Sequence, residues 1–191
     1  MRIITGSAKG KTLQTLPGLQ TRPTAEKVKE AVFSALQFEL EGRRVLDLFA
    51  GSGQMGLEAM SRGAAEVMFV DAAPEAMAVV KENAKKTGLF SDCRYLLSDY
   101  RSYLRKAAGR DTYHLFFIDP PYAMHACGDA AERIVTGGLA LPGAVLVLES
   151  EEEDVLSGAE QAAAALTLRR ATRYGRTWIH IYDYPGDSGR E

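Results

Sequence analysis

The 191-residue sequence is poor in cysteine: it contains only Cys93 and Cys127, far apart and without a CxxC spacing. This pattern argues against a disulfide framework and a cysteine-rich metal site, and it is typical of a cytoplasmic protein with reduced thiols. No apolar run approaches the roughly 20 residues that a membrane span requires, and no apolar signal segment follows the N-terminus. We therefore expect a cytoplasmic protein with no bound metal and no membrane partner.

The sequence also lacks internal repeats, low-complexity linkers and a large net charge. Its composition is 46% hydrophobic and 25% charged with a formal net charge of -2, as in ordinary globular proteins. A chain of this length fits one domain. We expect a single domain over residues 1–191, in which residues 1–22 form an N-terminal extension and residues 23–191 form the core.

Positive charge is nevertheless concentrated near both ends of the chain. Residues 1–30 carry a basic excess, and a second basic group lies near the C-terminus; the residues are Arg2, Lys9, Lys11, Arg22, Lys27 and Lys29, then Arg169, Arg170, Arg173 and Arg176. A basic patch on a slightly acidic protein can bind a phosphate backbone. The same residues could equally form an ordinary soluble surface.

The hydrophobic pattern divides the chain into short segments. It predicts an N-terminal β-hairpin over residues 1–16 that turns near residues 8–10, then a helix from about residue 24 to 36. Strands and helices then alternate: strands over 44–49, 66–71, 93–98, 114–119 and 144–150, and helices over 53–63, 74–88, 100–109 and about 126–137. Two last strands, 166–174 and 177–184, are separated by a short turn.

This order of elements predicts the fold class. Continuous apolar strands are typical of a parallel sheet that is covered on both faces. Strands that alternate with helices indicate right-handed crossovers and a doubly wound, Rossmann-like α/β fold. The terminal pair predicts an antiparallel hairpin at the end of an otherwise parallel sheet.

A glycine-rich loop follows the first of the alternating strands. Gly51, Gly53 and Gly56 have the spacing G-x-G-x-x-G, and Asp71 lies at the end of the next predicted strand. This pattern is typical of a nucleotide-binding loop, in which an acidic residue binds ribose hydroxyl groups. The glycines would also fit a tight strand–helix turn that binds no ligand.

Two further carboxylates favour S-adenosylmethionine over a dinucleotide. Asp47 lies just before the glycine loop, where it would repel a pyrophosphate but attract an ammonium group. Asp99 follows the third strand, where it could accept a hydrogen bond from an adenine amino group. Asp47, Asp71 and Asp99 are therefore expected at the carboxyl edge of the sheet, where ligands of such folds bind.

The fourth strand ends in Asp119-Pro120-Pro121-Tyr122. The two prolines fix the backbone and remove two donors, so this corner offers mainly hydrogen-bond acceptors. It suits an exocyclic amine: Asp119 and the Pro120 carbonyl would each accept one N–H, and Tyr122 could stack on the base. The same four residues could also simply end a strand.

Several motifs together resemble the RsmD family of bacterial 16S rRNA guanine-N2 methyltransferases. They are "MRII…KGKTLQ", "RPTAEKVKEAVFSAL", "LDLFAGSGQMGLEAMSRGA", "FVDAAP", "DPPY" and "RYGRT", which extend from the first residue to the terminal hairpin. "DPPY" is shared by amine methylases of several bases, so the N-terminal motifs are more specific for this family.

The resemblance implies a class I S-adenosylmethionine-dependent methyltransferase with a seven-stranded sheet. It implies methylation of a guanine N2 in 16S rRNA, in an assembled or assembling 30S particle, and we expect a monomer. The matching cofactor positions are Arg22, Thr24, Asp47, Gly51, Gly53, Asp71, Ala72, Asp99 and Tyr100; the catalytic positions are Asp119, Pro120, Pro121 and Tyr122; the expected RNA contacts are Arg2, Lys9 and Lys11.

Three other functions fit parts of the sequence. An adenine-N6 methyltransferase that acts on DNA or RNA would share the same corner and cofactor loop. A nicotinamide-dependent oxidoreductase would share the loop and Asp71, and a non-catalytic RNA-binding protein would share the basic N-terminal segment.

Overall fold

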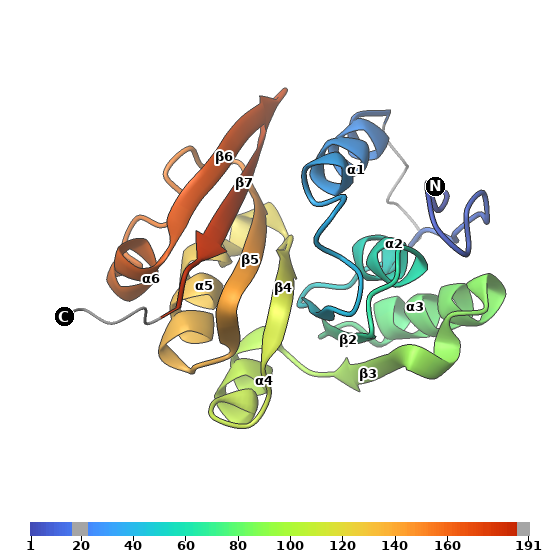
Figure 1. The fold of residues 1–191 in the computed structure, drawn as a ribbon, viewed down its shortest axis with the longest axis horizontal. Coiled ribbons are helices and arrows are strands. Elements are labelled where there is room, and N and C mark those ends of the chain that lie inside the picture. Colours follow the sequence, from blue (N-terminus) through green and yellow to red (C-terminus); the bar gives the residue numbers. More distant parts are fainter. Residues whose placement is uncertain (17–22, 187–191) are drawn as a thin grey trace. The chain divides into compact units, whose positions relative to one another are not determined.

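The computed structural model describes residues 1–16 and 23–186, which divide into two compact units (Figure 1). The first unit, Met1–Asp99, contains α1 (Pro23–Ala35), β1 (Arg44–Asp47), α2 (Gln54–Ser61), β2 (Glu66–Asp71), α3 (Pro74–Thr87), the short 3-10 helix η1 (Phe90–Asp92) and β3 (Cys93–Leu97). The second unit, Tyr100–Glu191, contains α4 (Tyr100–Ala107), β4 (Tyr113–Ile118), η2 (Tyr122–Met124), α5 (Cys127–Thr136), β5 (Ala140–Ser150), α6 (Glu160–Ala165), β6 (Thr167–Tyr174) and β7 (Thr177–Tyr184).

The three strands of the first unit are parallel. β2 lies between β1 and β3, with Met68 opposite Leu46 and Phe69 opposite Tyr95. The four inner residues of β2 are all buried, and α2 and α3 pack against this strand. Alternate residues of a strand point to opposite faces, so a buried strand interior means that both faces are covered. The three predicted strands are confirmed.

The second unit contains the antiparallel part of the fold. β4 and β5 are parallel, whereas β7 pairs antiparallel with both β5 and β6. β6 lies at the end of the sheet and is mostly exposed. The predicted terminal hairpin is confirmed, since β6 and β7 are joined by the tight turn at Gly175.

The helices also follow the predicted pattern, with one addition. α3 starts at Pro74 and ends before Gly88, whose φ of 76° is the left-handed conformation that glycine adopts easily. The predicted helix over about 126–137 is α5. α6 was not predicted, because a six-residue, alanine-rich helix is too short to show a helical repeat of apolar and polar residues.

The predicted N-terminal hairpin is reduced to one antiparallel bridge, between Arg2 and Thr12. Hydrogen bonds from the Ile3 N–H to the Lys11 carbonyl and from the Leu13 N–H to the Met1 carbonyl, both 2.9 Å, support this bridge. Toward the turn the Gly10 N–H donates to the Ile3 carbonyl at 2.9 Å, whereas the N–H groups of Ile4 and Thr5 donate to the carboxylate of Glu58.

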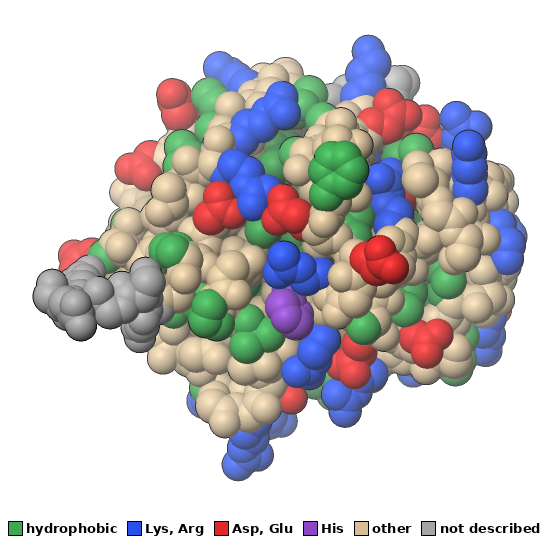
Figure 2. Space-filling model, in the orientation of Figure 1, with side chains coloured by type: hydrophobic (Ala, Val, Ile, Leu, Met, Phe, Trp, Pro, Cys, Tyr) green, Lys and Arg blue, Asp and Glu red, His purple; other side chains and the backbone are tan. Residues whose placement is uncertain are grey.

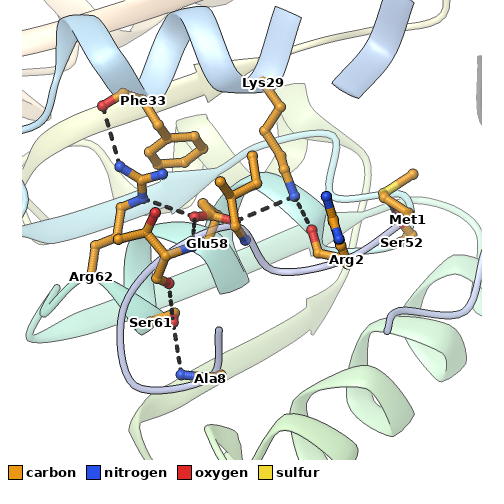
Figure 3. Close-up of polar contacts among 11 residues, drawn as sticks. Met1, Arg2, Ala8, Lys29, Phe33, Ser52, Glu58, Ser61 and Arg62 are labelled. Carbon is orange, nitrogen blue, oxygen red and sulfur yellow. Dashed lines mark hydrogen bonds and ion pairs between the residues drawn. The ribbon is translucent and has the colours of Figure 1, made fainter. Parts of the chain in front are cut away.

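Glu58, on α2, is the centre of a buried polar cluster that holds this segment (Figure 3). Its carboxylate accepts the N–H groups of Ile4 and Thr5 at 2.8 and 3.0 Å. The ammonium of Lys29, from α1, lies 3.3 Å away, and Arg62, one turn along α2, lies 2.8 Å away. A buried carboxylate is stable only when it is paired and hydrogen-bonded, and Glu58 satisfies both conditions.

Lys29 was grouped with the basic residues near the N-terminus, but in the structure it is buried and does not contribute to a basic surface. Its side chain is only 1% exposed, and its ammonium donates to the Arg2 carbonyl at 2.6 Å as well as pairing with Glu58. Burial lowers the pKa of Lys29, and the nearby Glu58 carboxylate opposes that shift. Lys29 therefore joins α1 to the N-terminal segment and is not available to a partner.

Both cysteines are free and buried. Burial raises the pKa of Cys93 to about 11 and also raises that of Cys127. Among residues 1–16 and 23–186, the helices are all too short or too polar to cross a bilayer.

The cluster around Glu58 predicts that Lys29→Met will strongly reduce stability. The substitution leaves Glu58 buried with one counter-charge, so we expect a loss of about 3 kcal/mol in the free energy of unfolding, measured by chemical denaturation. The matched control is Lys85→Met, which removes an exposed ion pair with Glu82 and should change stability by less than about 1 kcal/mol. Equal effects of the two substitutions would contradict the importance of the buried pair.

Candidate active site

The glycine loop joins β1 to α2 in the first unit. Gly51 and Gly53 have φ values of 53° and 76°, both in the left-handed region, and the Gly53 N–H donates to the Ala50 carbonyl at 2.7 Å. A Cβ added at Gly51 would meet no atom closer than the Phe49 carbonyl at 4.0 Å. The backbone at Gly51 is therefore open to a ligand at close range, as a cofactor loop requires.

Gly56 serves packing. A Cβ at this position would lie 2.3 Å from the ring of Phe69 on β2, so no larger residue fits between α2 and the strand. This is the role expected of the third glycine in such a motif, which permits close contact of helix and sheet.

Asp71 fixes the loop from the end of β2. Its carboxylate accepts the N–H of Gly51 and the N–H of Ala73, each at 2.8 Å. An ionised carboxylate has about four acceptor positions, so both oxygens keep capacity for further donors such as ribose hydroxyls. The residue is half-buried at the surface of the loop.

Asp47 is the unusual acid of the site. It is 4% exposed, and one of its oxygens accepts the N–H of Gly56 at 3.0 Å. Burial raises the pKa of Asp47 to about 7; the Gly56 N–H opposes the shift and the nearby Asp71 charge adds to it. A buried carboxyl group that titrates near neutral pH is suited to binding a cation.

Asn83 was not identified from the sequence. Its side chain is fully buried on α3, where its amide nitrogen donates to the carbonyls of Ser52 and Gln14 at 2.9 and 3.0 Å. Its amide oxygen accepts the N–H of Gln14 at 2.8 Å. Asn83 therefore joins the glycine loop to the N-terminal segment. The one sequence signal was asparagine, a weak helix former, in the middle of a helix.

Three other predicted cofactor residues are placed as follows. Ala72 and Asp99 are exposed, and they follow β2 and β3 respectively. Tyr100 begins the second unit, where it is buried and its hydroxyl donates to Asp129 on α5 at 2.7 Å.

The predicted N-terminal cofactor residues are not described in the same detail. Arg22 lies outside the described residues, and so does the side chain of Thr24, although its backbone belongs to the first turn of α1. Their roles remain predictions.

The acceptor-rich corner follows β4 in the second unit. Asp119 is exposed, Pro120 is buried, and Pro121 caps the short helix η2, which begins with Tyr122. Tyr122 is anchored by its hydroxyl, which lies 2.8 Å from the Thr177 hydroxyl and donates to the Glu149 carboxylate at 3.2 Å. The ring is thus held in one place by β5 and β7.

Glu149, like Asn83, was missed by the sequence analysis. It lies near the end of β5, and burial raises its pKa, against the effect of the Tyr122 hydrogen bond. Burial also raises the pKa of Tyr122 to about 12. The raised pKa of Tyr122 keeps the hydroxyl proton in place near neutral pH, so the hydroxyl can donate to Glu149.

The histidines do not form a nucleophilic or metal site. His125, just after the corner, pairs with Glu152, while His180 is buried and hydrogen-bonds to the Glu153 carbonyl at 2.9 Å. Over the described ranges 1–16 and 23–186, no group of three or more His, Cys, Asp or Glu residues is arranged to hold a metal ion.

The sequence matches a protein-family model, described as conserved hypothetical protein 95, over residues 1–183. It is 36% identical over 187 residues to a putative rRNA methyltransferase, YlbH, of Bacillus subtilis, a match that covers 97% of this chain and 100% of the relative. It is 30% identical over 185 residues to ribosomal RNA small subunit methyltransferase D of Escherichia coli, which covers 95% of this chain and 89% of the relative.

Solved structures show the same fold. A putative methyltransferase, yhhF, from Escherichia coli aligns with a TM-score of 0.84 at 28% identity, covering 96% of this chain and 97% of its own. A putative methylase from Haemophilus influenzae aligns with a TM-score of 0.81 at 25% identity, covering 97% and 98%. The predicted Rossmann-like class I fold is confirmed.

The raised pKa of Asp47 predicts pH-dependent cofactor binding. Attraction of an ammonium group needs the ionised carboxylate, so the affinity for S-adenosylhomocysteine should rise with pH, by up to about tenfold per unit, until the pH passes about 7. At still higher pH the ligand amine loses its own proton and the affinity should fall. Calorimetry over this range tests both limbs. Asp47→Asn should lose the rising limb, and a flat wild-type profile would contradict the role.

The contacts of Asn83 predict that Asn83→Leu will weaken cofactor binding. The Ser52 carbonyl loses its donor, so the loop is less ordered and the dissociation constant for S-adenosylhomocysteine should rise about tenfold. The control is Ser61→Ala, which removes hydrogen bonds to Ala8 and Thr5 in the same N-terminal segment but does not touch the loop. Both variants should lose stability, whereas only Asn83→Leu should lose affinity; equal affinities would contradict the positioning role.

Proposed function

The chain belongs to the family described as conserved hypothetical protein 95, and from that premise we propose that it is an S-adenosylmethionine-dependent rRNA methyltransferase whose target is the exocyclic N2 amine of a guanine in 16S rRNA. Relatives named as small-subunit rRNA methyltransferases support the RNA and the subunit. The corner Asp119–Tyr122 supports an exocyclic amine as the target, and the choice of guanine N2 rests on the family resemblance.

The first unit has residues that fit the cofactor. Asp71, oriented by two backbone amides, would bind the ribose hydroxyls, and Asp47 would bind the ammonium group. The open backbone at Gly51 would lie against the ligand, and Asp99 would accept the adenine amine. When bound, S-adenosylmethionine supplies an electrophilic methyl group on a sulfonium. Arg22, Thr24, Ala72 and Tyr100 are proposed to complete the site from the family pattern.

The second unit supplies the acceptors that an aromatic amine needs. The lone pair of such an amine is delocalised into the ring, so the amine is a weak nucleophile. We expect the Asp119 carboxylate and the Pro120 carbonyl to accept its two N–H groups, which orients the nitrogen and stabilises the positive charge that develops there. The exposed carboxylate of Asp119 can then take up the released proton and pass it to water.

Tyr122 is proposed to stack on the target base. Its ring cannot turn freely, because Glu149 and Thr177 hold the hydroxyl from two strands. This fixed ring beside an acceptor-rich corner is the single observation that carries the assignment of an amine substrate. We propose further that the enzyme acts as a cytoplasmic monomer and a single functional domain, on an assembled or assembling 30S particle.

The experiment is methyl transfer from tritium-labelled S-adenosylmethionine to small-subunit particles, free 16S rRNA and duplex DNA, followed by nucleoside analysis. Labelled N2-methylguanosine is the expected product. Labelled N6-methyladenosine would support the adenine alternative, and the absence of transfer to any of the three substrates would refute the proposal.

The assignment of Asp119 predicts that Asp119→Ala will lower turnover by about 10²–10³-fold, as the loss of a preorganised polar contact does elsewhere. The affinity for S-adenosylhomocysteine should stay within a few-fold of wild type. The control is Asp183→Ala, which removes an exposed carboxylate from β7 in the same unit and should leave turnover unchanged. Undiminished turnover of Asp119→Ala would contradict its role.

A further inference from the structure

The two basic groups seen in the sequence differ in the structure. In the C-terminal group, Arg169 pairs with Asp183, and Arg176 lies 2.8 Å from Glu151. Half of this group is therefore neutralised by carboxylates. Its other two members, Arg170 and Arg173, donate to neutral acceptors, the Thr172 hydroxyl and the Gly175 carbonyl.

The N-terminal group is instead enlarged, by lysines from α3. Lys11 donates to the Thr87 carbonyl at 2.8 Å, and Lys86 donates to the Thr12 hydroxyl at 3.0 Å. These reciprocal hydrogen bonds place the N-terminal segment beside the last turn of α3. Figure 2 has the orientation of Figure 1, and it shows Lys and Arg side chains along the edge of the molecule where the N-terminal segment and α3 lie.

A stacked aromatic pair with one exposed ring adjoins the same helix. Phe90 and Tyr95 are stacked, with ring centroids 5.2 Å apart, and Phe90 is 40% exposed. The ammonium groups of Lys81 and Lys85, one turn apart on α3, lie 5.8 and 5.7 Å from the ring centroids of Tyr95 and Phe90. The lysines and the aromatic rings therefore form one continuous surface.

We propose that this surface, which we call the α3 surface, binds substrate RNA beyond the target nucleotide. It consists of Lys11, Lys81, Lys85, Lys86 and Phe90, and Lys9 lies in the turn just before Lys11. The lysines bind phosphates and Phe90 stacks with an unpaired base. The inference rests on the proposed function, because it assigns the contact region for the RNA substrate of that function.

The chemistry of the surface favours RNA over an acidic protein segment. Lysines spaced along a helix and a neighbouring segment suit a chain of regularly spaced phosphates. An exposed aromatic ring between them suits the unstacked bases of a loop or single strand. Among the described residues, Glu82 is the carboxylate within ion-pair distance of these lysines, 3.1 Å from Lys85.

The test compares two pairs of basic residues in equivalent positions. Lys85 and Lys86 lie in the last turn of α3, and Arg105 and Lys106 lie in the last turn of α4. Lys85→Gln with Lys86→Gln, and Arg105→Gln with Lys106→Gln, change the net charge equally and remove the same type of helix-end interaction. Affinity for a fluorescent transcript of small-subunit rRNA is measured by anisotropy over a series of salt concentrations.

We expect the α3 pair alone to weaken binding. The plot of log affinity against log salt concentration has a negative slope, and its magnitude should decrease by about 0.7–0.9 for each lysine that contacts a phosphate. The affinity for S-adenosylhomocysteine should stay unchanged. Lys9→Gln with Lys11→Gln should give a similar loss. Equal losses for the α3 and α4 pairs, or no loss for either, would overturn the proposal.

The aromatic part has its own test. Phe90→Ala should lower RNA affinity about tenfold without changing the salt slope, because stacking releases no counterions. The control Phe38→Ala removes another exposed phenylalanine, 91% exposed, and should have no effect. Unchanged affinity of Phe90→Ala would show that Phe90 is not part of the RNA-binding surface.

The failure of this inference can be distinguished from the failure of the proposed function. If the wild-type protein transfers no methyl group to RNA, the proposed function fails. If it transfers the methyl group and the α3 variants bind RNA normally, this inference alone fails.

Discussion

The burial of the Glu58 carboxylate is the constraint on which the first unit depends. A charge in that position requires counter-charges and donors, and they come from three separate segments: Lys29 on α1, Arg62 just after α2 and the backbone of Ile4 and Thr5. The N-terminal segment is therefore an integral part of the first unit. The same logic repeats at Asn83, where one buried side chain satisfies both this segment and the glycine loop.

The sequence predicted those features that are encoded locally. β2 has the predicted bounds, Glu66–Asp71, because its apolar run is continuous and is bordered by charged residues. Long-range polar contacts were not predictable in this way. Lys29 reads as a surface charge in its helix, and only the fold reveals its partner Glu58, which lies far along the chain. The N-terminal hairpin is present but irregular for the same reason, since Glu58 accepts the amides of Ile4 and Thr5.

The sequence predicted which residues form the candidate site, but it did not predict the residues that hold them in place. The glycine spacing, Asp71 and the corner at Asp119–Tyr122 are readable as motifs, whereas Glu149 and Thr177 become meaningful only when β5 and β7 bring their side chains to the Tyr122 hydroxyl. The protonation state of Asp47 could not be read either. Burial of the Asp47 carboxyl raises its pKa, and this burial depends on the folded structure and not on the adjacent residues in the sequence.

The arginines of β6 have a further consequence, which concerns aggregation. β6 ends the sheet, so its outer backbone groups are an open template for a strand of another molecule. Arg170 and Arg173 place positive charge on this strand, and the register shift between Leu168 and Arg170 breaks its regular spacing. A second copy approaching along this edge would meet like charges and a mismatched ladder. The charge and the irregular spacing of β6 thereby oppose edge-to-edge association of neighbouring molecules at high concentration.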